Sequence, residues 1–158
     1  MRPVTAPLVA IVLLAAWLGA ALCVSALVAP AAFAVLPSRA VAGALIGRVL
    51  PVLFWSAIAL GVGVAASGFS TPDARAWRTS TALLVAASAA VAQFVIAPRI
   101  ALLRADIAGP VDALAASDPA RLAFGRLHGL SVACLGLGMA AAVVTLGLQI
   151  RLVIRSTT

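Results

Sequence analysis

Four long runs without charged side chains constrain the fold more than any other feature of this chain. Residues 3–38, 49–72, 79–98 and 127–150 are apolar and rich in Ala, Leu and Val. A helix needs ~20 apolar residues to cross ~30 Å of hydrocarbon, and every run is long enough. The alternating polarity of a membrane barrel is absent, and an open sheet would leave backbone groups unpaired in lipid. The sequence therefore predicts an all-α bundle of four transmembrane helices.

The composition supports a single integral membrane domain over residues 1–158. Hydrophobic residues make up 65% of the chain and charged residues 9%, whereas a soluble domain carries about 25% charged residues. We expect helices at about 7–36, 39–67, 72–104 and 119–152, with a polar connection at 105–118. The basic start and apolar core of residues 1–23 resemble a signal peptide, but the run exceeds the usual ~7–15 residues. We interpret it as a retained first helix.

The net charge of +7 reflects membrane flanks and does not indicate a nucleic-acid partner. All the basic residues are arginines, and they lie at the ends of the apolar runs, where guanidinium groups reach lipid headgroups. We expect a multi-pass protein of a bacterial-type inner or cell membrane. Five arginines lie on the side of the termini and six on the other side, and because several of the six are assigned to the candidate site, we expect cytoplasmic termini. The lipid bilayer is one expected partner, and a homodimer or another membrane protein is an alternative.

Local signals mark helix boundaries and distortions. Ser38, Thr71 and Asp118 are suited to cap the helices that follow them. Pro30 and Pro98 lie inside apolar helices and predict kinks. Trp17 and Trp55 are expected to face lipid, and Trp77 to mark an interface. Cys23 and Cys134 are expected to be small apolar residues without a disulfide.

A short internal repeat relates the two halves of the chain. "VAPAAFAVL" (28–36) corresponds to "IAPRIALLR" (96–104), and "ALIGRVLPV" (44–52) corresponds to "LAFGRLHGL" (122–130). The order is the same in both halves, which predicts two parallel helix hairpins related by an axis along the membrane normal. The polar residues near these motifs should then gather on the side of the 1–2 and 3–4 connections.

This side holds the candidate site, which we expect between the halves. On the fourth helix Phe124, His128 and Ser131 share one face, and an ionisable residue inside a membrane indicates function. Gly43 and Gly47, and Gly125, Gly129 and Ala133, form ridges that predict close helix packing. The candidate polar cluster consists of Arg48, Arg99, Phe124, Arg126, His128 and Ser131.

Three segments resemble the transmembrane protein 205-like family of small four-helix membrane proteins. They are "FAVLPSRAVAGALIGRVLPVLF" (33–54), "APRIALLR" (97–104) and "DPARLAFGRLHGLSVAC" (118–134). The most specific element is the run of Arg126, His128, Gly129 and Ser131. The family often has an asparagine seven residues after the histidine, where this chain has Leu135. The resemblance implies the fold and a membrane location but no catalytic activity.

Three functional hypotheses remain open. The first is a non-enzymatic protein that binds a partner, a lipid or a small solute at the Arg/His cluster, with no cofactor. The second is a haem-binding redox protein with His128 as axial ligand. The third is a transporter of a small anion or a metal. No catalytic pair and no metal-ligand spacing is present in the sequence, so we assign no catalytic residue and no metal site.

Overall fold

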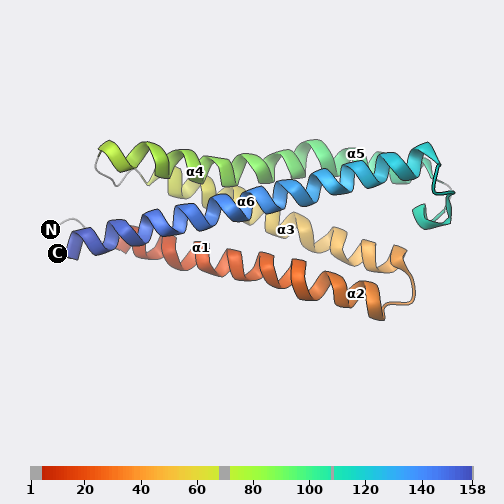
Figure 1. Cartoon of the computed structure of the whole chain (residues 1–158), viewed down its shortest axis with the longest axis horizontal. Coiled ribbons are helices and arrows are strands. Elements are labelled where there is room, and N and C mark those ends of the chain that lie inside the picture. Colours follow the sequence, from red (N-terminus) through yellow and green to blue (C-terminus); the bar gives the residue numbers. More distant parts are fainter. Residues whose placement is uncertain (1–4, 68–71, 108, 158) are drawn as a thin grey trace.

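The computed structural model describes residues 5–67, 72–107 and 109–157 and shows four helical rods lying side by side (Figure 1). The first rod comprises α1 (Thr5–Cys23), the π-helical segment η1 (Val24–Val28) and α2 (Ala29–Val35), and the second is α3 (Arg39–Ala66). The third rod comprises α4 (Pro72–Ala90), the π-helical η2 (Val91–Ile96) and α5 (Ala97–Asp106). The 3-10 helix η3 (Val111–Ala113) precedes the fourth rod, α6 (Pro119–Thr157).

Each rod is long and apolar enough to cross a membrane. The described residues contain no strand. The predicted all-α bundle of four transmembrane helices is therefore confirmed.

Side-chain caps define several helix ends. The Ser38 hydroxyl accepts a hydrogen bond from the Val41 N–H at 3.2 Å, and the Asp118 carboxylate accepts one from the Ala120 N–H at 2.8 Å. Both satisfy backbone donors that a first turn leaves open. The expected cap Thr71 lies outside the described residues. The last helix continues beyond the expected residue 152 to Thr157.

Each half of the chain contains a π-helical turn directly before its Ala-Pro pair. The Ala29 N–H donates to the Val24 carbonyl, five residues back, and the Ala97 N–H donates to the Ala92 carbonyl in the same way. A proline lacks the N–H of a helical bond and crowds the carbonyl one turn earlier, and a wider turn accommodates both effects. The distortions expected at Pro30 and Pro98 take this form, at corresponding places in the two halves.

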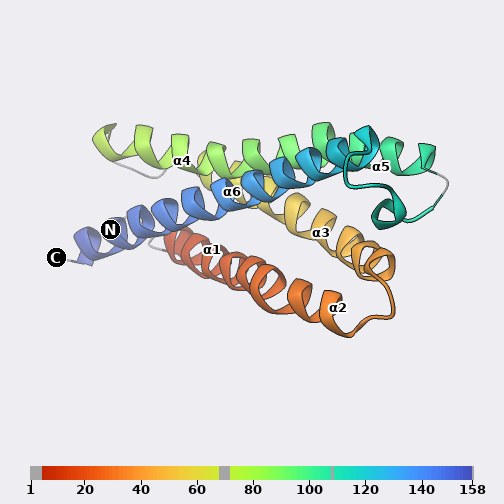
Figure 2. The same cartoon turned by 45° about the vertical axis from the view of Figure 1, so that its right-hand side comes forward.

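The rods pack tightly at the end that holds the termini and separate at the other end. There α1 packs against α3 and α6, while α4 packs against α3 and α6. At the opposite end α2 packs against α3 and lies apart from α5 in both views of the bundle (Figures 1 and 2). The splayed end carries the connections between α2 and α3 and between α5 and α6.

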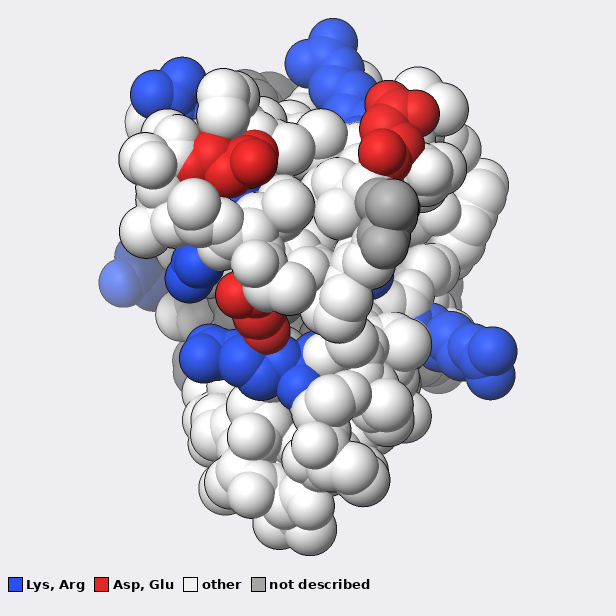
Figure 3. Space-filling model, turned by 90° about the vertical axis from the view of Figure 1, so that its right-hand side faces the viewer, with Lys and Arg blue, Asp and Glu red and all other residues white. Residues whose placement is uncertain are grey.

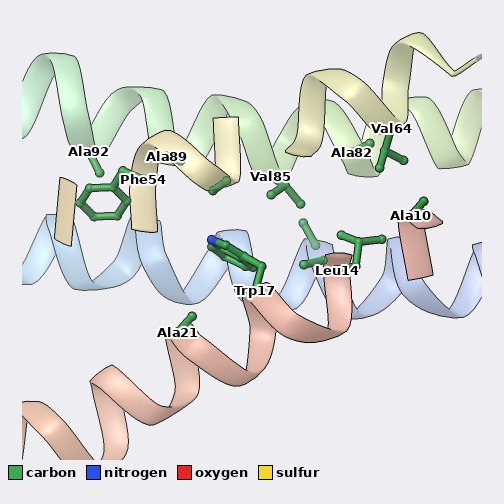
Figure 4. Packing of buried hydrophobic residues seen from close by; sticks show 13 residues of the cluster. Ala10, Leu14, Trp17, Ala21, Phe54, Val64, Ala82, Val85, Ala89 and Ala92 are labelled. Carbon is green, nitrogen blue, oxygen red and sulfur yellow. The ribbon is translucent and has the colours of Figure 1, made fainter. Parts of the chain in front are cut away.

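Trp17 lies in the centre of the packed region, which corrects its expected lipid-facing position. Its side chain is 6% exposed and points from α1 into a core of small residues (Figure 4). The indole N–H donates to the Leu53 carbonyl of α3 at 3.0 Å. An indole N–H in hydrocarbon needs an acceptor, and this carbonyl supplies it. Trp55 and Trp77 are exposed.

Close packing depends on two glycines that the expected ridges did not include. A Cβ on Gly61 would lie 2.5 Å from the Ala82 carbonyl oxygen of α4, and one on Gly138 would lie 2.9 Å from the Ser88 hydroxyl. By contrast, a Cβ on Gly47, Gly125 or Gly129 would meet nothing within 4 Å. At these three positions the helices therefore do not pack closely against a neighbouring helix, as the predicted ridges would require.

We expect Gly61→Ala to lower the free energy of unfolding by about 1–3 kcal/mol, because the added methyl group would push against α4 backbone. The matched control is Gly63→Ala on the same helix, where a Cβ meets nothing within 4 Å. The measurement is unfolding of both variants in detergent micelles. Equal stability of the two variants would contradict this account of the α3–α4 contact.

Candidate functional site

A cavity of about 690 Å³ lies at the splayed end, between the two halves of the chain. One wall is α3, the other is formed by η2, α5 and α6, and the connection at 109–112 contributes to its outer part. Its polar and aromatic lining side chains are Phe33, Arg39, Phe54, Gln93, Arg104, Asp112, Phe124, His128 and Ser131. From the sequence we expect a site between the two halves, on the side of the α2–α3 and α5–α6 connections, and the cavity lies at this position.

Small residues create the space. Gly43 and Gly47 of α3 face the cavity, as do Ala97 and Ala101 from the other wall. A Cβ on Gly47 would meet nothing within 4 Å, so a larger side chain there would project into empty volume. The glycines that were expected to bring helices together instead keep this part of the bundle open.

An ion pair crosses the outer part of the cavity. The Nε of Arg39, at the start of α3, lies 3.5 Å from an Asp112 carboxylate oxygen on η3. The two side chains are 75% and 51% exposed, and an exposed pair contributes only about 0–1 kcal/mol. Acidic and basic side chains lie next to each other on this end of the molecule (Figure 3). The Arg39–Asp112 pair is therefore a weak contact across the mouth, whereas Arg121 of α6 anchors the same connection by donating to the Leu114 carbonyl at 2.7 Å.

Arg104 lies across the same mouth without a carboxylate partner among the described residues. The carbon of its guanidinium group is 5.1 Å from the centre of the Phe124 ring, a cation–π distance. Its Nη2 would lie 3.2 Å from a Cβ on Gly43, so the side chain of this α5 residue reaches towards α3. Phe124 in turn stacks on His128, one helical turn along α6, with ring centres 6.1 Å apart.

Gln93 is a site residue that the sequence interpretation missed. It lines the cavity from η2, in the middle of the third span. Its Oε1 is buried and accepts no hydrogen bond. The amide itself could have identified Gln93 in the sequence, because a polar side chain inside an apolar span needs a partner. Gln93 therefore gives the membrane-embedded part of the cavity a polar group.

The six residues of the candidate cluster fall into two groups. Phe124, His128 and Ser131 line the cavity together, as their shared helix face predicts. Arg48, Arg99 and Arg126 are exposed and do not line the cavity. The arginines that line it are Arg39 and Arg104, which begin α3 and end α5.

A second polar set is buried between α4 and α6, near the termini. The Thr145 hydroxyl donates to the Thr81 hydroxyl at 2.9 Å, and Arg78 and Gln149 are 2% and 1% exposed. Arg78 is therefore an inward-facing residue and not a membrane flank. Hydrogen bonds between hydroxyls hold transmembrane helices together, and we assign this set to helix association.

The remaining candidate chemistry is limited. Cys23 and Cys134 are free, and Cys23 is exposed. Within the described ranges no three His, Cys, Asp or Glu side chains gather where they could hold a metal ion. The polar groups that line the cavity include guanidinium, carboxylate, amide and hydroxyl groups, which can form hydrogen bonds and charge pairs.

These features define an integral membrane protein with four apolar helical rods and a cavity between the two halves of its chain. The chain belongs to the family described as a domain of unknown function, DUF4149, whose family model matches residues 12–108. The matched region includes both π-helical turns and the α3 and α5 walls of the cavity. No curated protein and no solved structure matches the chain.

We expect Gln93→Leu to raise the free energy of unfolding by about 1 kcal/mol, because it removes a buried acceptor that has no donor. Unfolding in detergent micelles measures the change. Gln149→Leu is the matched comparison, since its Oε1 is also buried without a donor but lies outside the cavity. A loss of stability in Gln93→Leu would show that the amide has a partner in the folded protein.

Proposed function

We propose that this protein binds a small amphiphilic solute or lipid in the cavity between its halves. The observation that carries this proposal is the combination of apolar walls inside the membrane-spanning region with arginines at one end. Ligand sites are concave, mostly apolar and supplied with a few polar groups, with volumes of about 300–1,000 Å³. The cavity of about 690 Å³ falls within this range.

Binding without catalysis fits the contacts of the polar groups. His128 stacks on Phe124, and Asp112 pairs with Arg39. Nucleophilic or general-base catalysis needs a reactive side chain in hydrogen-bond reach of a base that a third group orients, and these contacts do not form that arrangement. We therefore propose a binding role for the described lining residues.

Haem binding is the second candidate, and one observation favours it. His128 lines the cavity, and its imidazole is a suitable axial ligand, while Arg39 and Arg104 could pair with propionates.

We also propose that the resemblance to the transmembrane protein 205-like family is a real relationship. Its most specific run, Arg126 to Ser131, lies beyond the residues that the family model matches.

The first experiment is native mass spectrometry of the protein released gently from detergent. We expect an additional mass corresponding to an amphiphile. Gly47→Leu should reduce its occupancy at least tenfold, because the side chain would project into the cavity and occupy space that the ligand needs. Gly63→Leu is the matched control on α3, since Gly63 is exposed and a Cβ there would meet nothing within 4 Å.

Two results would overturn the binding proposal. One is bare protein under all release conditions, and the other is a bound mass that is unaffected by Gly47→Leu. A bound haem with a Soret band that His128→Ala removes would establish the second candidate instead. Faster solute efflux from liposomes that contain the protein would favour the transport alternative.

We propose that both termini lie in the cytoplasm and that the arginines of the splayed end serve the cavity and not the orientation of the chain in the membrane. We expect a cytoplasm-dependent fluorescent reporter fused after Thr158 to be active. A periplasm-dependent reporter at the same position should be inactive. The reverse pattern would show that the splayed end, with the cavity, faces the cytoplasm.

A further inference from the structure

We propose that the ligand is a single-chain amphiphile with an oxyanion headgroup, a carboxylate or a phosphate, that binds Arg104 and Arg39 at the cavity mouth. Its chain would extend between α3 and α5 towards Gln93. This inference rests on the proposed function and adds the chemistry and the direction of the ligand.

The contacts of the Arg104 guanidinium group indicate that the ligand is an anion. Its guanidinium group lies over the Phe124 ring, and the described residues provide no carboxylate for it. The contact holds the guanidinium group at the mouth. Its N–H donors project from the edges of the guanidinium plane, and because none of them pairs with a carboxylate among the described residues, they can bind a bidentate oxyanion.

Arg39 can join the same headgroup. Its present partner, Asp112, is held through one exposed contact at 3.5 Å, which is weak enough for a competing oxyanion to replace. Two guanidinium groups and one carboxylate line the cavity, so the lining has an excess of positive charge. Asp112 should accordingly act against binding, because it repels an anion and neutralises Arg39.

The shape of the cavity indicates a single chain. Arg104 and Gln93 are eleven residues apart along one rod, which corresponds to about 16 Å at the rise of an α-helix. The wall between them includes Ile46, Leu50 and Ile100. A volume of about 690 Å³ holds roughly 20 groups the size of a water molecule. One alkyl chain with its headgroup fits this space, and the second chain of a two-chain lipid would lie outside it.

The test is binding of radiolabelled dodecanoate to the full chain in nanodiscs of zwitterionic lipid, with unlabelled competitors. We expect dodecanoate and dodecyl phosphate to compete, dodecanol to be at least tenfold weaker, and inorganic phosphate not to compete. Arg104→Gln should weaken dodecanoate binding about tenfold, and Arg104→Lys should restore part of it. Asp112→Asn should strengthen binding severalfold without changing the competition by dodecanol.

Arg99→Gln is the matched control, because Arg99 lies on the same helix as Arg104 but does not line the cavity. It should leave binding unchanged. The opposite effects expected for Arg104→Gln and Asp112→Asn separate a charge effect from misfolding, since misfolding would weaken binding in both variants.

Different failures have different meanings. Equal binding of dodecanol and dodecanoate, with a loss in Gly47→Leu, would overturn the oxyanion inference and support the cavity-binding function. Competition by inorganic phosphate as strong as by dodecanoate would overturn the role of the chain. Absence of all dodecanoate binding would overturn the inference, and the mass spectrum of the Gly47→Leu variant would then decide the proposed function separately.

Discussion

The absence of water in the hydrocarbon is the constraint on which the rest of this structure depends. Every backbone N–H and C=O in the spans must find a partner within the protein, so the chain forms four long helices. Polar side chains meet the same demand. The Trp17 indole bonds to the Leu53 carbonyl, and hydroxyls such as those of Ser25 and Ser56 bond to carbonyls of their own helices.

The position of the cavity depends on where neighbouring helices pack closely and where they do not. Near the middle of the bundle and towards the termini, Gly61 and Gly138 let neighbouring helices approach. Towards the other end, Gly47 faces open volume, and a Cβ there would meet nothing within 4 Å. The same residue type thus has opposite effects, depending on whether a neighbouring helix is present. The arginines at the ends of α3 and α5 then give the open volume a charged mouth, which is the basis of the proposed anionic ligand.

The sequence predicted part of the candidate site because helical periodicity is a local property. Phe124, His128 and Ser131 repeat at three and four residues, so their common face could be recognised without a structure. Which of the eleven arginines line the cavity could not be predicted in this way. Whether Arg99 or Arg104 faces the cavity depends on how α5 is rotated against α3. The role of Gln93 likewise depends on the neighbours of a single amide within an apolar span.

The sequence by itself determined the number of spans, their approximate limits and the side on which the two Ala-Pro and Gly-Arg motifs gather. These properties depend on the length of apolar runs and on chain order. The tertiary structure alone decided which faces point inward. Lipid chains and the protein core are equally apolar, so hydropathy does not distinguish them. Trp17 is buried and Trp55 exposed because packing geometry and the availability of a hydrogen-bond acceptor separate these two similar residues.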